Sequence, residues 1–245
     1  MKGILLIDKP SGWTSFDAVN RVRRLIQHSE HNVTGKKRFP VGHTGTLDPL
    51  ATGLLVLLLG TYTKLAPGLT KLDKTYEVTM RLGQTSTTGD EEGEKTITSD
   101  ACPTEAELLA VIEQYTGLIM QVPPVYSAIK VNGQRAYALA RAGKAPQLEA
   151  RPATIHRLEL TGYSYPDVSF TTHVSSGTYI RSLVEDMGKA LGTGAYMSNL
   201  RRTTVGDFTL ATAMSTEGLT IEQIAAHVFE LPLTPTEGVA TEATT

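Results

Sequence analysis

The chain is poor in the residues that build cysteine-based sites and membrane spans. Its 245 residues include one cysteine, Cys102, so an internal disulfide and a metal site made of several cysteines are both excluded. No apolar run approaches the roughly 20 residues that cross a bilayer, and the apolar segment near the N-terminus is too short for a signal peptide. We therefore expect a soluble, cytoplasmic protein with no membrane partner.

Positive charge is absent from the end of the chain. Residues 203–245 carry six acidic residues and no lysine or arginine, and residues 90–113 carry eight acidic residues and one basic residue. Residues 1–81 and 129–202 instead hold 12 and 10 basic residues against six and five acidic ones, within a net charge of −2. Charge sorted in this way favours one positive face, as phosphate binding requires, although a solvated mixture with no functional face gives the same counts.

The remaining composition is typical of a globular protein, with 40% hydrophobic and 20% charged residues, and the length suits one large domain or two small ones. Apolar and alternating runs predict strands at residues 3–7, 54–59, 73–83, 153–165 and 167–176. The polar, acidic stretch 84–100 is typical of a mobile loop, and Asn132-Gly133 indicates a hairpin.

Helices are predicted at several N-cap signals. The first begins with Ser15 as N-cap and carries an inward stripe of Phe16, Val19, Val22, Arg23 and Ile26. A short helix is expected over 64–70, ending at Pro67-Gly68. Capping boxes open two more, from Thr104 to Glu107 with Leu108, Leu109 and Ile112 buried, and from Thr220 to Gln223.

The most specific stretch is residues 42–53, with the sequence GHTGTLDPLATG, directly before the apolar run 54–59. Asp48 is its one carboxylate. Glycine accepts positive φ, and proline fixes its own φ and restricts the residue before it, so this turn should hold Asp48 still. The six aliphatic residues suit a strand buried on both faces, which would support the turn rigidly. A rigid acid suits catalysis, whereas an ordinary Asp-Pro turn before a core strand is the alternative.

This stretch resembles the catalytic motif of the TruB-type tRNA pseudouridine synthases, which isomerise the uridine at position 55 in the T-loop of tRNA. The resemblance runs from about Lys2 to about Leu210, and further matching segments lie at 8–15, 121–137, 176–186 and 198–203. It implies an α+β fold in which a mixed, largely antiparallel sheet is flanked by helices and carries a central active-site cleft. It also implies tRNA, held by its T-arm, as the partner.

The resemblance gives individual residues their expected roles. Asp48 takes the place of the catalytic aspartate, which acts on a flipped-out uridine by attack at C1′ or by removal of the C2′ proton. Arg181 takes the place of the arginine that pairs with it. Arg181 also lies near an expected helix start, where the helix dipole does not favour a cation, so an anionic partner is independently expected. Tyr76 would stack on the base and accept a proton, Tyr179 would line the uracil pocket, and Leu200 would pack against the base.

Further residues are expected to contact or support the substrate. The resemblance places His43 beside the flipped uridine, Lys74 in the same element as Tyr76, and Lys9 in support of the catalytic loop. Since a tyrosine hydroxyl is a weak base near neutral pH, Tyr76 would need local tuning or a bound water. A structural histidine and a core tyrosine are the alternatives for such isolated residues.

Basic residues supply candidates for contact with the RNA backbone, with cations that face only water as the alternative. The candidates are Lys36, Lys37, Arg38, Lys130, Arg135, Arg141, Lys144, Arg201 and Arg202.

Pseudouridine formation breaks and remakes a glycosidic bond without an oxidant, an energy donor or a metal, so we expect no cofactor and no metal. Two other hypotheses remain open. One is a non-catalytic tRNA-binding or RNA-folding module in which Asp48 is idle. The other is a metal-dependent phosphoesterase that uses Asp48, His43 and Asp8, although it lacks clustered carboxylates.

The chain is expected to form one catalytic domain over residues 1–212, which includes an RNA-gripping insertion at about 121–151. Residues 213–245 should add a short helix and an acidic tail, disordered from about Pro235 rather than RNA-binding. The small PUA-type domain that many family members carry is not expected here. We expect a monomer that needs no protein partner.

Overall fold

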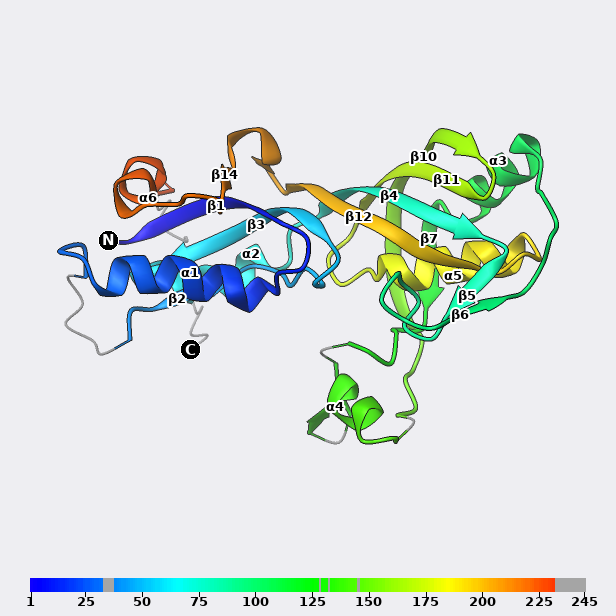
Figure 1. The fold of residues 1–245 in the computed structure, drawn as a ribbon, viewed down its shortest axis with the longest axis horizontal. Coiled ribbons are helices and arrows are strands. Elements are labelled where there is room, and N and C mark those ends of the chain that lie inside the picture. Colours follow the sequence, from blue (N-terminus) through cyan, green and yellow to red (C-terminus); the bar gives the residue numbers. More distant parts are fainter. Residues whose placement is uncertain (33–37, 128, 132, 145, 232–245) are drawn as a thin grey trace, which may run out of the picture.

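The computed structural model describes residues 1–32, 38–127, 129–131, 133–144 and 146–231. The molecule is elongated, with an N-terminal half and a second half (Figure 1). Strands β4 (Lys74–Leu82) and β12 (Ala195–Val205) run from the middle of the molecule into the second half. The expected α+β class is confirmed, because helices flank one mixed, mostly antiparallel sheet.

The sheet runs in the order β14-β1-β3-β12-β4-β11-β10-β7, with β2 beside β3 and β13 beside β12. Only the β1–β14 and β3–β12 pairs are parallel among the described strands. The strands not yet bounded are β1 (Gly3–Lys9), β2 (Val41–His43), β3 (Thr52–Leu59), β7 (Gly117–Gln121), β10 (Arg151–Ser164), β11 (Asp167–Val174), β13 (Phe208–Thr209) and β14 (Met214–Ser215).

Helices, 3-10 turns and two short hairpins lie outside this sheet. The helices are α1 (Ser15–Gln27), α2 (Ala66–Leu69), α3 (Glu105–Gln114), α4 (Ala136–Arg141), α5 (Ile180–Ala190) and α6 (Ile221–His227), with 3-10 turns at Gly60–Leu65 and Leu210–Thr212. Two separate hairpins pair β5 (Gln84–Ser86) with β6 (Lys95–Ile97) and β8 (Lys130–Val131) with β9 (Gln134–Arg135).

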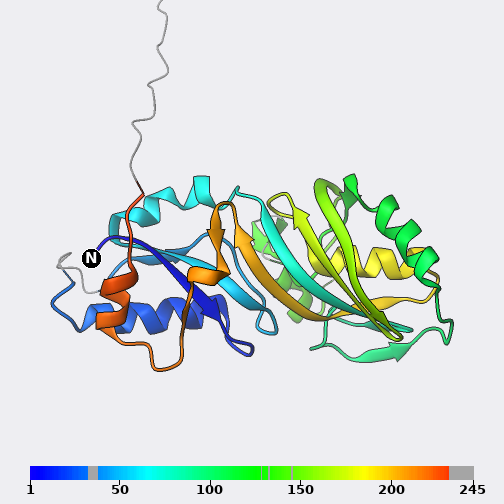
Figure 2. The same cartoon turned by 90° about the horizontal axis from the view of Figure 1, so that it is seen from above.

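The prediction that residues 54–59 form a strand buried on both faces is confirmed. Alternate side chains point to opposite faces, so Leu55, Leu57 and Leu59 pack with α1 and α6, whereas Leu54 and Val56 pack with the α2 side. Figure 2 shows these helices on the two sides of the N-terminal half. The end of the 42–53 stretch is therefore fixed in the core.

Helix α1 starts one residue earlier than its sequence suggested. Thr14, not Ser15, is the N-cap, because Asp17 lies three residues after Thr14 and completes a capping box. Ser15 is then free to reach another loop. Phe16 is 55% exposed, so its place in the inward stripe was wrong, and Ala18 is buried there instead.

Three further predictions need correction. Residues 84–100 are not a mobile loop but contain the β5–β6 hairpin. Pro67 lies in the first turn of α2 rather than at a helix end, since its missing N–H costs nothing there. The capping boxes at Thr104 and Thr220 are confirmed, but in α3 Val111 is buried where Leu109 was expected.

The chain after residue 212 packs on the N-terminal half. Strand β14 pairs with β1, Phe229 forms a bridge with Ile4, and the buried Leu219 and Ile224 join the core beside α1. The expected boundary at residue 212 therefore falls within continuous packing. The expected disorder from Pro235 concerns residues outside the described part. No helix in the described ranges is both long and apolar enough to span a membrane.

Candidate active site

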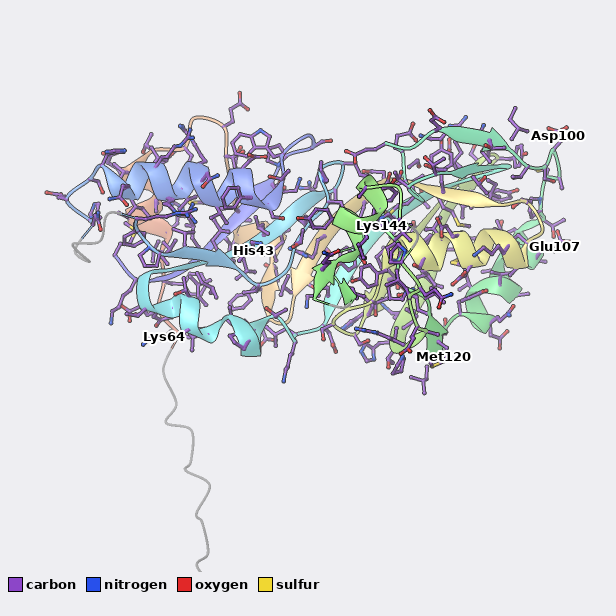
Figure 3. The ribbon with its side chains drawn as sticks, turned by 90° about the horizontal axis from the view of Figure 1, so that it is seen from below. His43, Lys64, Asp100, Glu107, Met120 and Lys144 are labelled. Atoms are coloured by element: carbon purple, nitrogen blue, oxygen red, sulfur yellow. The ribbon has the colours of Figure 1, made fainter. Side chains whose placement is uncertain are left out.

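A cavity of about 620 Å³ opens beside the neighbouring strands β12 and β4. Its wall also includes the motif loop (residues 44–49), the loop between β5 and β6, the insertion and the start of α5. The residues that line it are Thr44–Pro49, Thr70, Lys74, Tyr76, Thr88, Asp90, Glu92, Tyr126, Ser127, Tyr137, Ser175, Gly177–Arg181, Leu200 and Arg202. Helix α4, which carries Tyr137, projects from the body in Figure 1, and Lys144, which follows α4, lies on the face seen in Figure 3. These separate segments thus meet around the residues that follow His43.

Asp48 and Arg181 meet in this cavity. Arg181 Nη2 lies 3.0 Å from Asp48 Oδ2, and the same guanidinium donates to the carbonyls of Thr88 at 3.2 Å and Tyr126 at 2.9 Å. The Arg181 side chain is 7% exposed and that of Asp48 36%, so the carboxylate is the accessible member of the pair. The arginine fixes the orientation of Asp48 and stabilises its negative charge.

Two residues of the first helix and strand hold the loop around Asp48. Ser15 Oγ accepts from Leu47 N at 2.8 Å and donates to Leu47 O at 3.1 Å. The buried Lys9 donates to the carbonyls of Pro10 at 2.9 Å, Trp13 at 2.6 Å and Pro49 at 3.3 Å. Burial lowers the pKa of Lys9 to about 8, and the nearby Asp48 charge opposes that shift. Lys9 therefore lies where its expected supporting role requires.

Arg202 is not available to an RNA backbone, so that prediction was wrong. Its side chain is buried and donates to the carbonyls of Leu54 at 2.8 Å, Gly45 at 3.1 Å and Thr46 at 3.5 Å. The backbones are so close that a Cβ on Gly53 would lie 2.3 Å from Arg202 O. Arg202 therefore positions the motif loop from inside the protein.

Arg201 points to the opposite face of β12, as strand alternation requires. It donates to both carboxylate oxygens of Asp8, at 2.7 and 3.3 Å, and to Thr52 Oγ1 at 3.2 Å. It lines a second cavity with Asp8 and Trp13, so its predicted phosphate contact has no support. Asp8, His43 and Asp48 are also not grouped, which removes the geometry that a metal-dependent phosphoesterase needs.

The aromatic and apolar wall of the active-site cavity comes from Tyr76, Tyr179 and Leu200. Tyr76 and Leu200 are buried on the neighbouring strands β4 and β12. Tyr179 is the N-cap residue of α5, and Gln121 holds its backbone, donating to Tyr179 O at 2.9 Å and accepting from Tyr179 N at 2.7 Å. Burial raises the pKa of the Tyr179 hydroxyl. The three residues expected around the base thus face one space with Asp48.

Lys74 and His43 lie close to the cavity in different settings. Lys74 lines it, and its ammonium donates to the carbonyls of Thr70 at 2.7 Å and Leu72 at 2.5 Å. Burial lowers the pKa of Lys74 to about 8, with help from the Arg202 charge. His43 does not line the cavity, and its Nδ1 accepts from Gly45 N at 3.3 Å. Burial lowers the pKa of His43, so the ring is neutral near pH 7.

Sequence reasoning missed two carboxylates of the site. Asp90 is buried 3.7 Å from Arg181 Nη1, and Glu92 lines the same cavity. Burial, followed by the charges of Asp90 and Asp48, raises the pKa of Glu92. Both residues lie in the acidic stretch that was assigned to a loop, and no spacing or periodicity there distinguishes a buried acid from a solvated one.

Apart from Arg201 and Arg202, the expected RNA-backbone residues fall in three groups. Arg38 and Lys144 are exposed. Lys36 and Lys37 lie outside the described residues. The backbones of Lys130, Arg135 and Arg141 belong to the β8–β9 hairpin and α4, but their side chains lie outside the described set.

Comparison with known proteins places this site in a family. Residues 32–180 match the model described as TruB family pseudouridylate synthase (N terminal domain), and residues 181–234 match the tRNA pseudouridylate synthase B C-terminal domain. The proteins named tRNA pseudouridine synthase B from Burkholderia mallei (strain NCTC 10247) and Cupriavidus metallidurans are 48% and 47% identical over 219 and 230 residues. These alignments cover 89% and 93% of this chain and 69% and 68% of those proteins.

Solved structures agree with this assignment. A chain in the crystal structure of a Cbf5-Nop10-Gar1 complex superposes with a TM-score of 0.66 at 29% identity, covering 87% of this chain and 52% of that one. A chain of an H/ACA RNP bound to a substrate RNA containing 2′-deoxyuridine gives 0.62 at 27%, covering 87% and 50%. This chain therefore spans about half the length of those chains.

The fold and these matches define the protein as a pseudouridylate synthase. The chain belongs to the TruB family, as its sequence motifs suggested. The two family models meet at residues 180 and 181, yet β12 of the second segment lies between β3 and β4 of the first, so the halves form one sheet.

Proposed function

We propose that this protein isomerises uridine to pseudouridine at position 55 in the T-loop of tRNA. The observation that carries the proposal is the accessible Asp48 carboxylate, held at 3.0 Å by Arg181 in a cavity walled by Tyr76, Tyr179 and Leu200. The names of the relatives, tRNA pseudouridine synthase B, support tRNA as the substrate. A related chain bound to RNA that contains a uridine analogue supports a nucleoside in the cavity.

The target uridine must leave the RNA stack to reach Asp48, because its sugar and base edge are covered in folded RNA. The cavity volume of about 620 Å³ lies within the range of roughly 300–1,000 Å³ that small-molecule sites occupy. Tyr76 and Tyr179 would hold the flat uracil ring after its bond to the sugar breaks. Leu200 would keep water from that intermediate, which matters because the detached base has to turn and rejoin.

Asp48 would act on the ribose, by attack at C1′ or by removal of the C2′ proton. Arg181 would orient the carboxylate for either step, since two backbone carbonyls hold the guanidinium in place. Tyr76, which lines the same cavity, would accept the proton from C5 of the base. A primary isotope effect on the reaction rate, measured with RNA whose target uridine is deuterated at C2′, would identify removal of the C2′ proton as the path.

The chain would hold the T-arm through its exposed basic residues, Arg38 and Lys144 among those described, and would act as a monomer. Such contacts neutralise phosphates and release counterions, so the tRNA affinity should fall steeply with rising salt.

The test is the Asp48→Asn variant on a T-arm minihelix, with pseudouridine mapped by mass analysis. We expect no product and a tRNA affinity within a few-fold of wild type, because the amide keeps the shape and removes the reactive carboxylate. Asp207→Asn, at an exposed position, is the matched control and should react normally. Near-normal turnover by Asp48→Asn would contradict the proposal, and a wild type that binds without reacting would support the non-catalytic alternative.

A further inference from the structure

Three side chains from separate segments meet on the second half of the sheet, away from the active-site cavity. Asp73 directly precedes β4, His173 lies on β11, and His156 lies on β10 at an irregularity in its pairing with β11. The ligand atoms of the three residues all lie within 4.8 Å of one another. Within the described ranges, this is the group of histidine, cysteine and carboxylate side chains that has the spacing of a metal site.

The group lies on the opposite face of the sheet from Asp48. His173 pairs with Thr75, so the two side chains share a face, and Asp73 lies on that face two residues earlier. Lys74 and Tyr76 alternate with them and line the active-site cavity. Helices α3 and α5 pack on the cavity side, whereas the other face is half-exposed along β11.

Both imidazoles turn the same atom toward one carboxylate oxygen. His156 Nε2 lies 3.1 Å from Asp73 Oδ2, and His173 Nε2 lies 3.8 Å from it. The rings are edge to face, with centroids 5.0 Å apart at 71°. Zinc binds such atoms at about 2.0–2.2 Å in a tetrahedron, which separates neighbouring ligands by about 3.3 Å. Small side-chain rotations therefore suffice to place all three around one ion.

We propose that Asp73, His156 and His173 form a zinc site with a water as fourth ligand. Two imidazoles and one carboxylate are donors that suit zinc, whereas magnesium and calcium prefer oxygen ligands. The side chains are 40–44% exposed, so an ion can enter and a water can complete the coordination. The ion would join β4, β10 and β11 and stabilise their pairing. It would take no part in pseudouridine formation, which uses the other face.

The test is calorimetric titration of zinc into untagged, full-length protein stripped with a chelator. A Cys102→Ser background removes the one thiol, which is exposed and could bind zinc by itself. We expect one ion per chain, and at least about tenfold weaker binding in His156→Gln and in His173→Gln. His227→Gln removes an exposed histidine elsewhere and should bind zinc as the background does. Zinc should also raise the melting temperature of the background and not that of a double variant that carries both His156→Gln and His173→Gln.

Retained pseudouridine formation and an unchanged circular dichroism spectrum would show that the variants are folded. If the double histidine variant did not fold, Asp73→Asn would give the same comparison with a near-isosteric change. The absence of saturable zinc binding by the background would overturn the proposal. Equal binding by the background and the ligand variants would also overturn it, since the ion would then lie elsewhere.

Discussion

The hydroxyl of Ser15 and the backbone of Leu47 exchange two hydrogen bonds, with Ser15 Oγ accepting at 2.8 Å and donating at 3.1 Å. Leu47 is the residue before Asp48, and both partners are buried. One side chain at the start of α1 thus fixes the peptide that presents the Asp48 carboxylate. The N-cap role falls to Thr14, which leaves the Ser15 hydroxyl for this contact.

Ser15→Ala tests this connection. Removal of the hydroxyl leaves a buried N–H and a buried carbonyl without partners, so we expect a loss of about 1–3 kcal/mol in the free energy of unfolding. We also expect kcat to fall more than KM rises, because Asp48 is displaced while the base pocket remains. Ser29→Ala, at the end of α1, is a control that should lower stability slightly and leave kcat unchanged. A kcat equal to wild type in Ser15→Ala would show that the loop holds its shape unaided.

Arg181→Lys should be severely impaired, because an ammonium cannot reproduce the planar fork that reaches Asp48 and two carbonyls together. Arg181 is buried but Asp48 is 36% exposed, so the loss of this contact should cost about 1.5–3 kcal/mol rather than the larger cost of breaking a fully buried pair. If most of this appears in the transition state, kcat/KM falls by about one to two orders of magnitude. Single-turnover rates at saturating tRNA measure the effect. A rate within a few-fold of wild type would mean that a point charge alone is enough.

Tyr76→Phe should bind tRNA normally and stall after the glycosidic bond breaks. The ring remains in place to stack on the base, since Tyr76 is buried against β12, but the hydroxyl that we propose as acceptor of the C5 proton is gone. Mass analysis of the reaction mixture should reveal a trapped adduct or a cleaved intermediate. Weaker tRNA binding with a normal chemical rate would instead assign Tyr76 to the wall of the pocket alone.

The parts of the fold that the sequence predicted well are those with strong local signals. Six successive aliphatic residues predict the buried strand β3, and the threonine and glutamate of Thr104-x-x-Glu107 predict the start of α3. The same rule, applied at Thr14 and Asp17, predicts the true start of α1, where Ser15 was chosen instead. These signals depend on residues within one turn of each other.

The parts that could not be predicted depend on long-range pairing. Nothing local in residues 195–205 shows that β12 lies between β3 and β4. Without that strand order, Arg201 and Arg202 resemble an exposed basic pair. Because side chains alternate along β12, Arg201 points to Asp8 and Arg202 points to the backbone of the motif loop. Asp90 was missed for the same reason, because only the folded hairpin brings it beside Arg181.

Lys9 gives a pH-dependent prediction. Its pKa is about 8 in the folded protein against 10.5 in the unfolded chain, chiefly because burial penalises the charge. Below pH 8 both states bind the proton, so the penalty is fully present. Between pH 8 and 10.5 the folded state releases the proton first, so the contribution of Lys9 to the free energy of unfolding rises with pH. The free energy of unfolding of wild type should therefore rise relative to that of Lys9→Met across this window. Denaturant titrations at several pH values measure the difference, and a constant difference would place the Lys9 pKa near its ordinary value.

Replacement by methionine should have different effects at Arg202 and at Lys144. At Arg202 it should lower the stability of the fold, whereas at Lys144 it should reduce the salt dependence of tRNA binding. Arg202→Met leaves the buried carbonyls of Gly45 and Leu54 without their donor, so we expect a loss of about 2–4 kcal/mol in the free energy of unfolding and a slower reaction. Its tRNA affinity should keep the salt dependence of wild type, since the guanidinium does not reach solvent.

Lys144 is exposed on the projecting segment, so Lys144→Met should unfold as wild type does. If Lys144 contacts a phosphate, the slope of log affinity against log salt should decrease by about one. Denaturation and binding at several salt concentrations separate the two outcomes. A reduced salt slope in Arg202→Met with unchanged stability would return Arg202 to the RNA-binding surface.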